Sequence, residues 1–400
     1  MKYLIILAFF IMPFHSCTTT RKMSDNQTPK GHFRLYTYPA KRLVEKIDEN
    51  KYKKLTFVVS NDFAGNINPT FYPIKNRFNE HRILKVGGIP AMRAYLDIFR
   101  DEFKDNLVYV DAGSFLHPED NHSFTIFLYN YLGVDAAALG LNEFLINRNS
   151  TINYPSYIQK ITKKSKFKIL NSNVTYLLSD VQLQNKGIAS HTIKEVNGIK
   201  VGFIGALTQN LSKKIPDHNI NGLHIENPAK NVILSSNTLR RKGAQIIVLM
   251  ANSGINCSSM LAEEESIIEE KVNFNTNESK FCDTHNNEFY KLLQQLPPQT
   301  VDLVFTSGEE NKVANKILGY PVLQSPGRGK FFSWVEVYFD KKHNLIDRAK
   351  TKIHQPVQLC HSFLQDSQDC FTMEGIEDKE LVPATFFGKK INIGPLPRFQ

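Results

Sequence analysis

Continuous apolar runs that end in short polar turns recur five times along the chain. The first spans residues 54–65, where the run LTFVV leads into SNDFAG. Such runs are typical of strands covered on both faces, and ligand sites in sheets of this kind gather where the strands end. The other turns are DAGS (111–114), GLNEF (140–144), NSG (252–254) and SGEEN (307–311). The pattern predicts five loops that converge on one edge of a sheet and build one pocket.

Apolar residues at helical spacing separate these strands, so the chain alternates strands and helices. Helices are predicted over 88–104, 123–132, 228–241 and 287–296, and further strands over 107–110, 134–139, 168–170, 245–250, 301–305, 321–324, 331–339 and 346–353. Apolar and polar residues alternate on both sides of Asn197-Gly198, a pair that favours a β-hairpin between 191–196 and 200–204. The chain is therefore predicted to have an α/β fold.

The first residues have the pattern of a targeting segment. Lys2 precedes a short apolar region at 3–14, too brief to span a bilayer, and Cys17 follows it. This resembles a bacterial lipoprotein signal, with 1–16 as signal peptide and Cys17 as the lipidated residue. We expect a cell-envelope protein anchored to the membrane by that lipid, on the periplasmic or outer-membrane side; a secreted protein with an ordinary cleaved signal is the alternative. Residues 17–53, which begin as a polar stretch, suit a tether.

Four further cysteines indicate an oxidising compartment. Three pairings of Cys257, Cys282, Cys360 and Cys370 are possible, and the shortest loops favour 257 with 282 and 360 with 370. A zinc site is the rival interpretation, but the spacing C-x2-C is absent. The first pair would enclose an acidic surface insertion (257–282). The second would lie in a C-terminal tail (354–400).

Composition and net charge limit the classes of binding partner that we expect for the chain. A chain of 400 residues accommodates one large domain with appendages, and its net charge is +10 at pH 7. The lysines are spread over many segments, with no clustered basic and aromatic stripe, so we expect no nucleic-acid partner.

Several segments resemble, in the right order, the calcineurin-like metallophosphoesterases and specifically their 5'-nucleotidase branch. They are LTFVVSNDFAG, GGIPAMRAYL, YVDAGS, YLGVDAAALGLNEF, NSNV, EVNGIKVGFIGALT, GAQIIVLMANSG and VDLVFTSGEE. The resemblance implies a four-layer α/β/β/α sandwich over 54–353, with two mixed sheets flanked by helices. It also implies two metal ions, held by Asp, His and Asn ligands, that polarise a phosphoryl group and supply a hydroxide.

The resemblance locates the family's metal-binding positions, and most of them lack a ligand here. Only Asp62 keeps the expected residue type. The other positions hold Ala64 for a His, Ser114 for the bridging Asp, Leu141 for the ligand Asn, Asn142 for the catalytic His, Asn252 for a His, and Glu309 and Asn311 for the two His of a turn that keeps Gly308. We therefore expect neither catalysis nor a resident metal, but a degenerate polar pocket, with Ser114 as a pocket hydroxyl and Arg328 facing inward.

Two interpretations keep a metal. Asp62 and Glu309, with Glu143, could hold a single Ca²⁺ or Mg²⁺. The run HPEDNH, with His117, Glu119, Asp120 and His122, could be a relocated site, although a polar loop that caps a helix is the plainer explanation. The preferred function is binding of a small polar ligand or an envelope protein. The alternative is a divergent phosphoesterase that uses one or two Mn, Zn, Mg or Ca ions.

Overall fold

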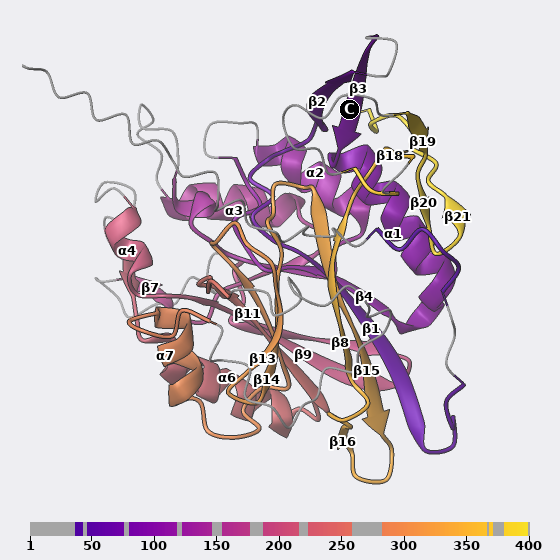
Figure 1. The fold of residues 1–400 in the computed structure, drawn as a ribbon. Helices are drawn as coiled ribbons and strands as arrows, with labels where there is room; N and C mark the ends of the chain where they lie inside the picture. The colour runs from indigo at the N-terminus through magenta and orange to yellow at the C-terminus, as the bar shows by residue number, and fades with distance from the viewer. Residues whose placement is uncertain are drawn as a thin grey trace, which may run out of the picture. The chain divides into compact units, whose positions relative to one another are not determined.

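Two mixed β-sheets lie face to face in this fold, with helices on their outer faces (Figure 1). The computed structural model describes residues 37–42, 46–75, 80–117, 122–145, 154–176, 187–215, 223–257, 282–365, 368–370 and 380–398. These residues belong to one compact unit, Arg34–Gln400; the other unit, Met1–Phe33, is not described. The predicted signal peptide (1–16), Cys17 and the interior of the predicted insertion therefore lie outside the described residues. Within the described ranges, each helix is too short or too polar to span a bilayer.

The first sheet contains the strand on which the sequence argument began. Its order is β16 (Leu345–Ile346), β15 (Phe331–Asp340), β1 (Tyr52–Ser60), β4 (Leu107–Asp111), β5 (Ala136–Ala138) and β6 (Lys168–Leu170), and β17 (Lys352–Gln358) also pairs with β15. Strands β1, β4, β5 and β6 are parallel, whereas β15 runs antiparallel to β1. All ten residues of β15 are buried, and β1 is buried from Leu55 onward. Burial on both faces explains why the buried parts of these strands are mostly apolar.

The second sheet supplies the other half of the core. Its order is β13 (Val313–Ile317), β14 (Tyr320–Gln324), β12 (Leu303–Ser307), β11 (Ile246–Asn252), β9 (Ile199–Leu207) and β8 (His191–Val196). The predicted hairpin joins β8 and β9, and both Asn197 (φ 48°) and Gly198 (φ 67°) have the left-handed backbone that such turns require. Between the sheets, the rings of Phe57 and Phe305 have centroids 6.0 Å apart within one shared apolar cluster.

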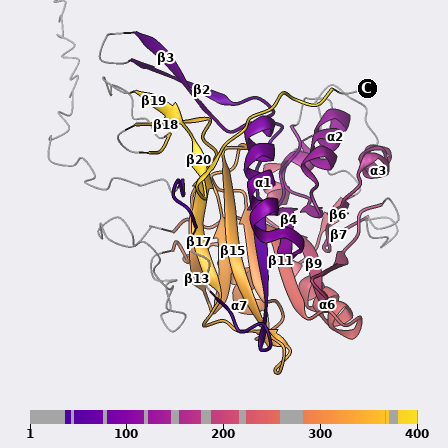
Figure 2. The same cartoon turned by 90° about the vertical axis from the view of Figure 1, so that its right-hand side faces the viewer.

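Helices form the outer two layers (Figure 2). The first sheet is covered by α1 (Ile89–Phe103), α2 (His122–Leu132) and α3 (Tyr154–Lys164), and the second by α6 (Pro228–Arg241) and α7 (Glu288–Gln295). Asn227 and Asn287 cap the last two helices by accepting N–H groups of their first turns. The predicted α/β/β/α sandwich of two mixed sheets is confirmed, and α3 is a helix that the sequence pattern did not predict.

Several short elements were also not predicted. They are β2 (Thr70–Lys75), β3 (His81–Val86), β7 (Val174–Tyr176), α4 (Leu211–Lys214), β10 (Leu223–Ile225), β13, β18 (Ser362–Leu364), β19 (Leu381–Pro383), β20 (Thr385–Phe386) and β21 (Lys389–Lys390). The prediction of one strand over 346–353 was wrong. Residues 347–351 interrupt it, because the Asp347 carboxylate accepts the N–H groups of Ala349 and Lys350 and holds a turn there.

The segments outside 54–353 also pack against the sandwich. Strand β17 crosses the boundary expected at residue 353, and Phe386 and Phe387 are buried in the core beyond it. On the N-terminal side, the ring of Tyr38 lies edge-on to Trp334, with centroids 5.7 Å apart. Aromatic side chains outside residues 54–353 thus complete the cover of the first sheet.

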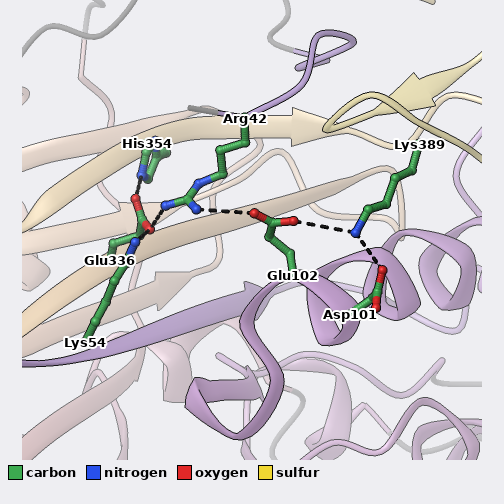
Figure 3. Close-up of polar contacts among 7 residues, drawn as sticks. All are labelled: Arg42, Lys54, Asp101, Glu102, Glu336, His354 and Lys389. Carbon is green, nitrogen blue, oxygen red and sulfur yellow. Dashed lines mark hydrogen bonds and ion pairs between the residues drawn. The ribbon is translucent and has the colours of Figure 1, made fainter. Parts of the chain in front are cut away.

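A buried carboxylate ties these outer segments to the sheet (Figure 3). Glu336 on β15 forms ion pairs with Arg42 and Lys54, and the Nε2 atom of His354 lies 3.2 Å from its carboxylate. Burial alone would raise the pKa of Glu336, but the hydrogen bond with His354 and the neighbouring positive charges lower this pKa to about 2. Glu102 of α1 joins the network through Arg42, at 3.5 Å.

Both predicted disulfide pairings are confirmed. Cys257 is bonded to Cys282, and Cys360 to Cys370. The first bond joins the segment after β11 to the segment before α7. It therefore brings residues from 283 onward next to the strand ends where the pocket was expected.

Candidate functional site

The loops at the carboxyl ends of the strands enclose a cavity of about 480 Å³. It is lined by Asp62, Ala64, Ser114, Leu141, Asn142, Thr208, Asn210, Lys214, Asn252, Ser253, Gly254, Asp283, His285, Asn286, Asn287, Glu288, Gly308, Glu309, Glu310, Pro326 and Arg328. Every pocket position named from the sequence is in this set except Asn311. The Asn311 side chain instead forms hydrogen bonds with Asn256 and with Gln324 Nε2, the latter at 2.6 Å. The five loops thus meet at one site.

Backbone hydrogen bonds fix the first two loops against each other. The Asp62 N–H donates to the Gly113 carbonyl at 2.9 Å, and the Ala64 N–H donates to the Ser114 carbonyl at 3.0 Å. Asp62 (φ 47°), Ala64 (φ 50°) and Ser114 (φ 60°) all have left-handed backbone, which is costly for residues with a side chain. The surrounding bonds hold this strained conformation in place.

Asn252, at a family His position, joins three loops. Its Nδ2 donates to Ser307 Oγ at 2.6 Å and to Ser114 Oγ at 3.2 Å, while its Oδ1 accepts the Leu141 N–H at 3.1 Å. Ser307 Oγ in turn donates to the Ala112 carbonyl at 2.8 Å. Asn252 is 1% exposed, so these bonds lie in a buried environment. Both polar atoms of its side chain cross-link the loops.

Glu143 is buried and holds the second and third loops together. Its carboxylate accepts the N–H groups of Leu116 at 2.8 Å, Gly140 at 2.6 Å and Ser114 at 3.1 Å. Burial raises the pKa of Glu143 to about 7, against the lowering effect of these hydrogen bonds. Both carboxylate oxygens bind backbone, and Glu143 is not in the cavity lining. The structure therefore does not place Glu143 together with Asp62 and Glu309 in the cavity lining, as the single-ion interpretation requires.

Asp62, the one expected ligand type that remains, is half-buried at the cavity. Its Oδ2 accepts the Gly308 N–H at 2.7 Å and the Asn61 side-chain amide at 2.9 Å. Burial raises the pKa of Asp62 to about 6, and the negative charges of Glu310 and Glu309 add to this effect. The Asp62 carboxyl group therefore keeps its proton to a higher pH than an ordinary aspartate does.

Three charged side chains of the cavity lining, Glu309, Glu310 and Arg328, lie at or beside the fifth loop. Arg328 lies in the cavity lining, and its Nε donates to Glu310 Oε1 at 2.7 Å. Glu309 makes no hydrogen bond or ion pair with the part of the chain that the structure describes. Gly254 faces Glu309 closely, so that a Cβ atom there would overlap the Glu309 side chain.

The side chains at the family's metal positions do not fit two divalent ions. Ala64 and Leu141 have no ligating side-chain atom, and Asn252 is committed to neighbouring loops. Hard divalent ions need several oxygen or imidazole ligands around one point. Among the described residues, no group of three or more His, Cys, Asp or Glu side chains is placed to share an ion. No phosphoryl-transfer step through metals can be assigned to this donor set.

Of the HPEDNH run, the structure describes only His117 and His122. Its His122 begins α2, and the Nε2 atom of His122 lies 2.7 Å from the His117 carbonyl oxygen. Neither histidine lines the cavity. Glu119 and Asp120, and with them the expected helix cap, lie outside the described residues.

One wall of the cavity was not predicted. Thr208, Asn210 and Lys214 follow β9, the lining residues between 283 and 287 precede α7, and Glu288 is the first residue of α7. The apolar run of β9 ends in a polar turn like the other five strands, which was a usable signal. The pairing of Cys257 with Cys282 was a second signal, because it places residue 283 beside the NSG loop.

Comparison with known proteins supports the resemblance seen in the motifs. No family model matches the chain. The 5'-nucleotidase of Rattus norvegicus is 23% identical over 331 residues, which are 78% of this chain and 50% of that protein. The human 5'-nucleotidase is 22% identical over 314 residues, 73% of this chain and 48% of that one. A cell wall protein, Lmo0130 of Listeria monocytogenes, is 22% identical over 283 residues, 64% of this chain and 34% of its own length.

Solved structures agree on the fold. A putative 5'-nucleotidase from Staphylococcus aureus has a TM-score of 0.56 at 18% identity, covering 81% of this chain and 56% of that one. The calcineurin-like phosphoesterase YfkN from Bacillus subtilis has a TM-score of 0.53 at 16% identity, covering 77% and 91%. The chain therefore has the calcineurin-like phosphoesterase fold. Within it, the sequence relatives point to the 5'-nucleotidase branch, and the chain spans about half the length of those relatives.

Proposed function

We propose that this chain is a non-catalytic cell-envelope protein whose 5'-nucleotidase-like pocket binds a small polar ligand or an envelope partner. The observation that carries the proposal is the Asn252 network. Asn252 and Ser114 stand where the family places metal ligands, and the neutral Asn252 amide donates to the hydroxyl of Ser114 and to that of the neighbouring Ser307. These bonds stabilise the loops by direct contact, a task that bridging ions would otherwise perform.

The charge of the cavity also disfavours phosphate ester hydrolysis. A phosphoryl group needs positive charge around it as negative charge develops in the transition state. Lys214 and Arg328 are the cations in the lining, and Arg328 is paired with Glu310. Asp62 and Glu309 would repel an anion at the same place.

Location in the cell envelope rests on two kinds of support. Cys257 is bonded to Cys282 and Cys360 to Cys370, as in proteins of oxidising compartments. One relative is named a cell wall protein. Lipidation at Cys17 is part of the same proposal, with the polar stretch after it as tether.

The deciding experiment measures metal and turnover together. The compact unit from residue 34 onward would be incubated with Mn²⁺, Zn²⁺ and Mg²⁺, desalted, and analysed by elemental mass spectrometry. The same samples would be assayed with AMP and with bis(4-nitrophenyl) phosphate. We expect no stoichiometric metal and no turnover that chelation abolishes. One or two metals per chain with chelator-sensitive hydrolysis would overturn the proposal in favour of a divergent phosphoesterase.

A further inference from the structure

We propose that the cavity selects a small hydrophilic amine, bound as a cation, and rejects phosphate esters. This inference rests on the proposed function, that the cavity is a binding site, and adds the charge class of the ligand. The proposed ligand is a cation, whereas the fold suggests an anionic ligand.

The charge balance of the lining is the first observation. The cavity is lined by five carboxylate side chains, Asp62, Asp283, Glu288, Glu309 and Glu310, against the two cations Lys214 and Arg328. The whole chain, in contrast, has a formal net charge of +10. Acidic groups are thus concentrated at the cavity of a basic protein, and such a field favours cations inside it.

The second observation is which of these carboxylates are available. Glu310 is paired with Arg328, and Glu288 Oε2 accepts the Asn210 N–H at 3.0 Å. Within the described ranges, the carboxylates of Glu309 and Asp283 accept no hydrogen bond. Glu309 follows β12 and Asp283 precedes α7, so the two come from different elements of the wall. An ammonium group in the cavity could form charge-assisted hydrogen bonds with them.

The neutral part of the lining indicates the rest of the ligand. Thr208, Ser253, Asn142 and Asn286 offer hydroxyl and amide groups. Among the described lining residues, the only aromatic ring is the imidazole of His285, so they offer a nucleobase no Phe, Tyr or Trp platform for stacking. A volume of about 480 Å³ suits a small molecule. These features match an amine that also carries hydroxyl groups, such as a hexosamine.

Three probes of related chemistry test the charge class. Calorimetric titrations near neutral pH would compare D-glucosamine, its neutral N-acetyl derivative, and AMP, with the compact unit from residue 34 onward. We expect D-glucosamine to bind at least about tenfold more tightly than N-acetyl-D-glucosamine, and AMP not to bind. Added salt should weaken the binding of D-glucosamine.

Matched variants locate the effect at the cavity. Glu309→Gln should weaken D-glucosamine binding about tenfold. Glu195→Gln, an equal change of charge at an exposed position of β8 outside the lining, should leave it unchanged. Asp283→Asn is a second cavity variant if Glu309→Gln melts at a much lower temperature than the wild type.

Each outcome separates this inference from the proposed function. Equal or tighter binding of N-acetyl-D-glucosamine or AMP would overturn the charge inference while leaving the cavity as a binding site. An unchanged affinity for D-glucosamine in both cavity variants would do the same. If none of the three probes binds at about 10 mM, the charge inference fails, whereas the proposed function is still judged by the metal and turnover assay.

Discussion

Replacing Asn252 by Ala tests the network on which the proposed function depends. The substitution removes three hydrogen bonds, to Leu141 N, Ser114 Oγ and Ser307 Oγ. One buried hydrogen bond contributes about 1 kcal/mol net, and partners left unsatisfied cost more. Water entering from the adjacent cavity would satisfy part of the exposed groups. We therefore expect Asn252→Ala to lower the free energy of unfolding by about 2–3 kcal/mol.

The assay is urea unfolding followed by circular dichroism, with linear extrapolation to water. Asn142→Ala is the matched control, because its half-buried amide lines the same cavity but makes one long contact, 3.4 Å to the Ser114 carbonyl. The control should lose no more than about 0.5 kcal/mol. If both variants lose the same amount, the Asn252 bonds do not stabilise the loops, and the main support for a metal-independent pocket is gone.

Three further substitutions probe other parts of the structure. The pKa of Glu336 is lowered to about 2, so its stabilising effect is present above its ordinary pKa of 4.5 and is lost as pH falls towards 2. Between neutral pH and about pH 2, urea titrations should show the wild type losing about 3 kcal/mol more than Glu336→Gln; equal losses would contradict the ion-pair network. The pKa of Asp62 is raised to about 6, so ionising it costs stability as pH rises. Asp62→Asn should therefore melt at a higher temperature than the wild type above pH 6 but not near pH 4, and the reverse order would refute this. Gly140→Ala places a Cβ against Ser114 and should cost about 2 kcal/mol or more, whereas Gly394→Ala, in open space, should cost little; equal melting temperatures would show that the loops yield easily.

The sheets could be predicted because burial on both faces leaves a continuous apolar run. Strands such as β15 and β11 are buried along their whole length, so most of their positions are apolar and the pattern is easy to recognise. The β2–β3 hairpin could not be predicted in the same way. Phe71 and Ile83 are more than half exposed, and a proline such as Pro73 within β2 disfavours the prediction of a strand. Elements that bury little apolar surface give a weak sequence signal.

Residues of the site could be predicted where the end of a strand determines their position. They could not be predicted where the hydrogen-bond partners of the side chain determine its role. Asp62, Ser114 and Asn252 follow apolar runs, and the sheet edge brings them together. The sequence could not distinguish Glu143 from a possible ligand, because only the folded loops show that its carboxylate accepts three backbone N–H groups. Asn311 was misplaced for a related reason: Asn256 and Gln324 bind its side chain outside the lining.

The strained loops argue that the pocket is maintained and is not merely left over. Left-handed backbone at Asp62, Ala64 and Ser114 persists only where surrounding bonds compensate for its cost. Those bonds come from within the chain, through the Gly113 and Ser114 carbonyls and the Asn252 amide. A loop with no remaining role would be expected to relax to an unstrained conformation once no ion held it. Backbone strain that the chain itself holds in place fits the proposed role of the pocket in binding.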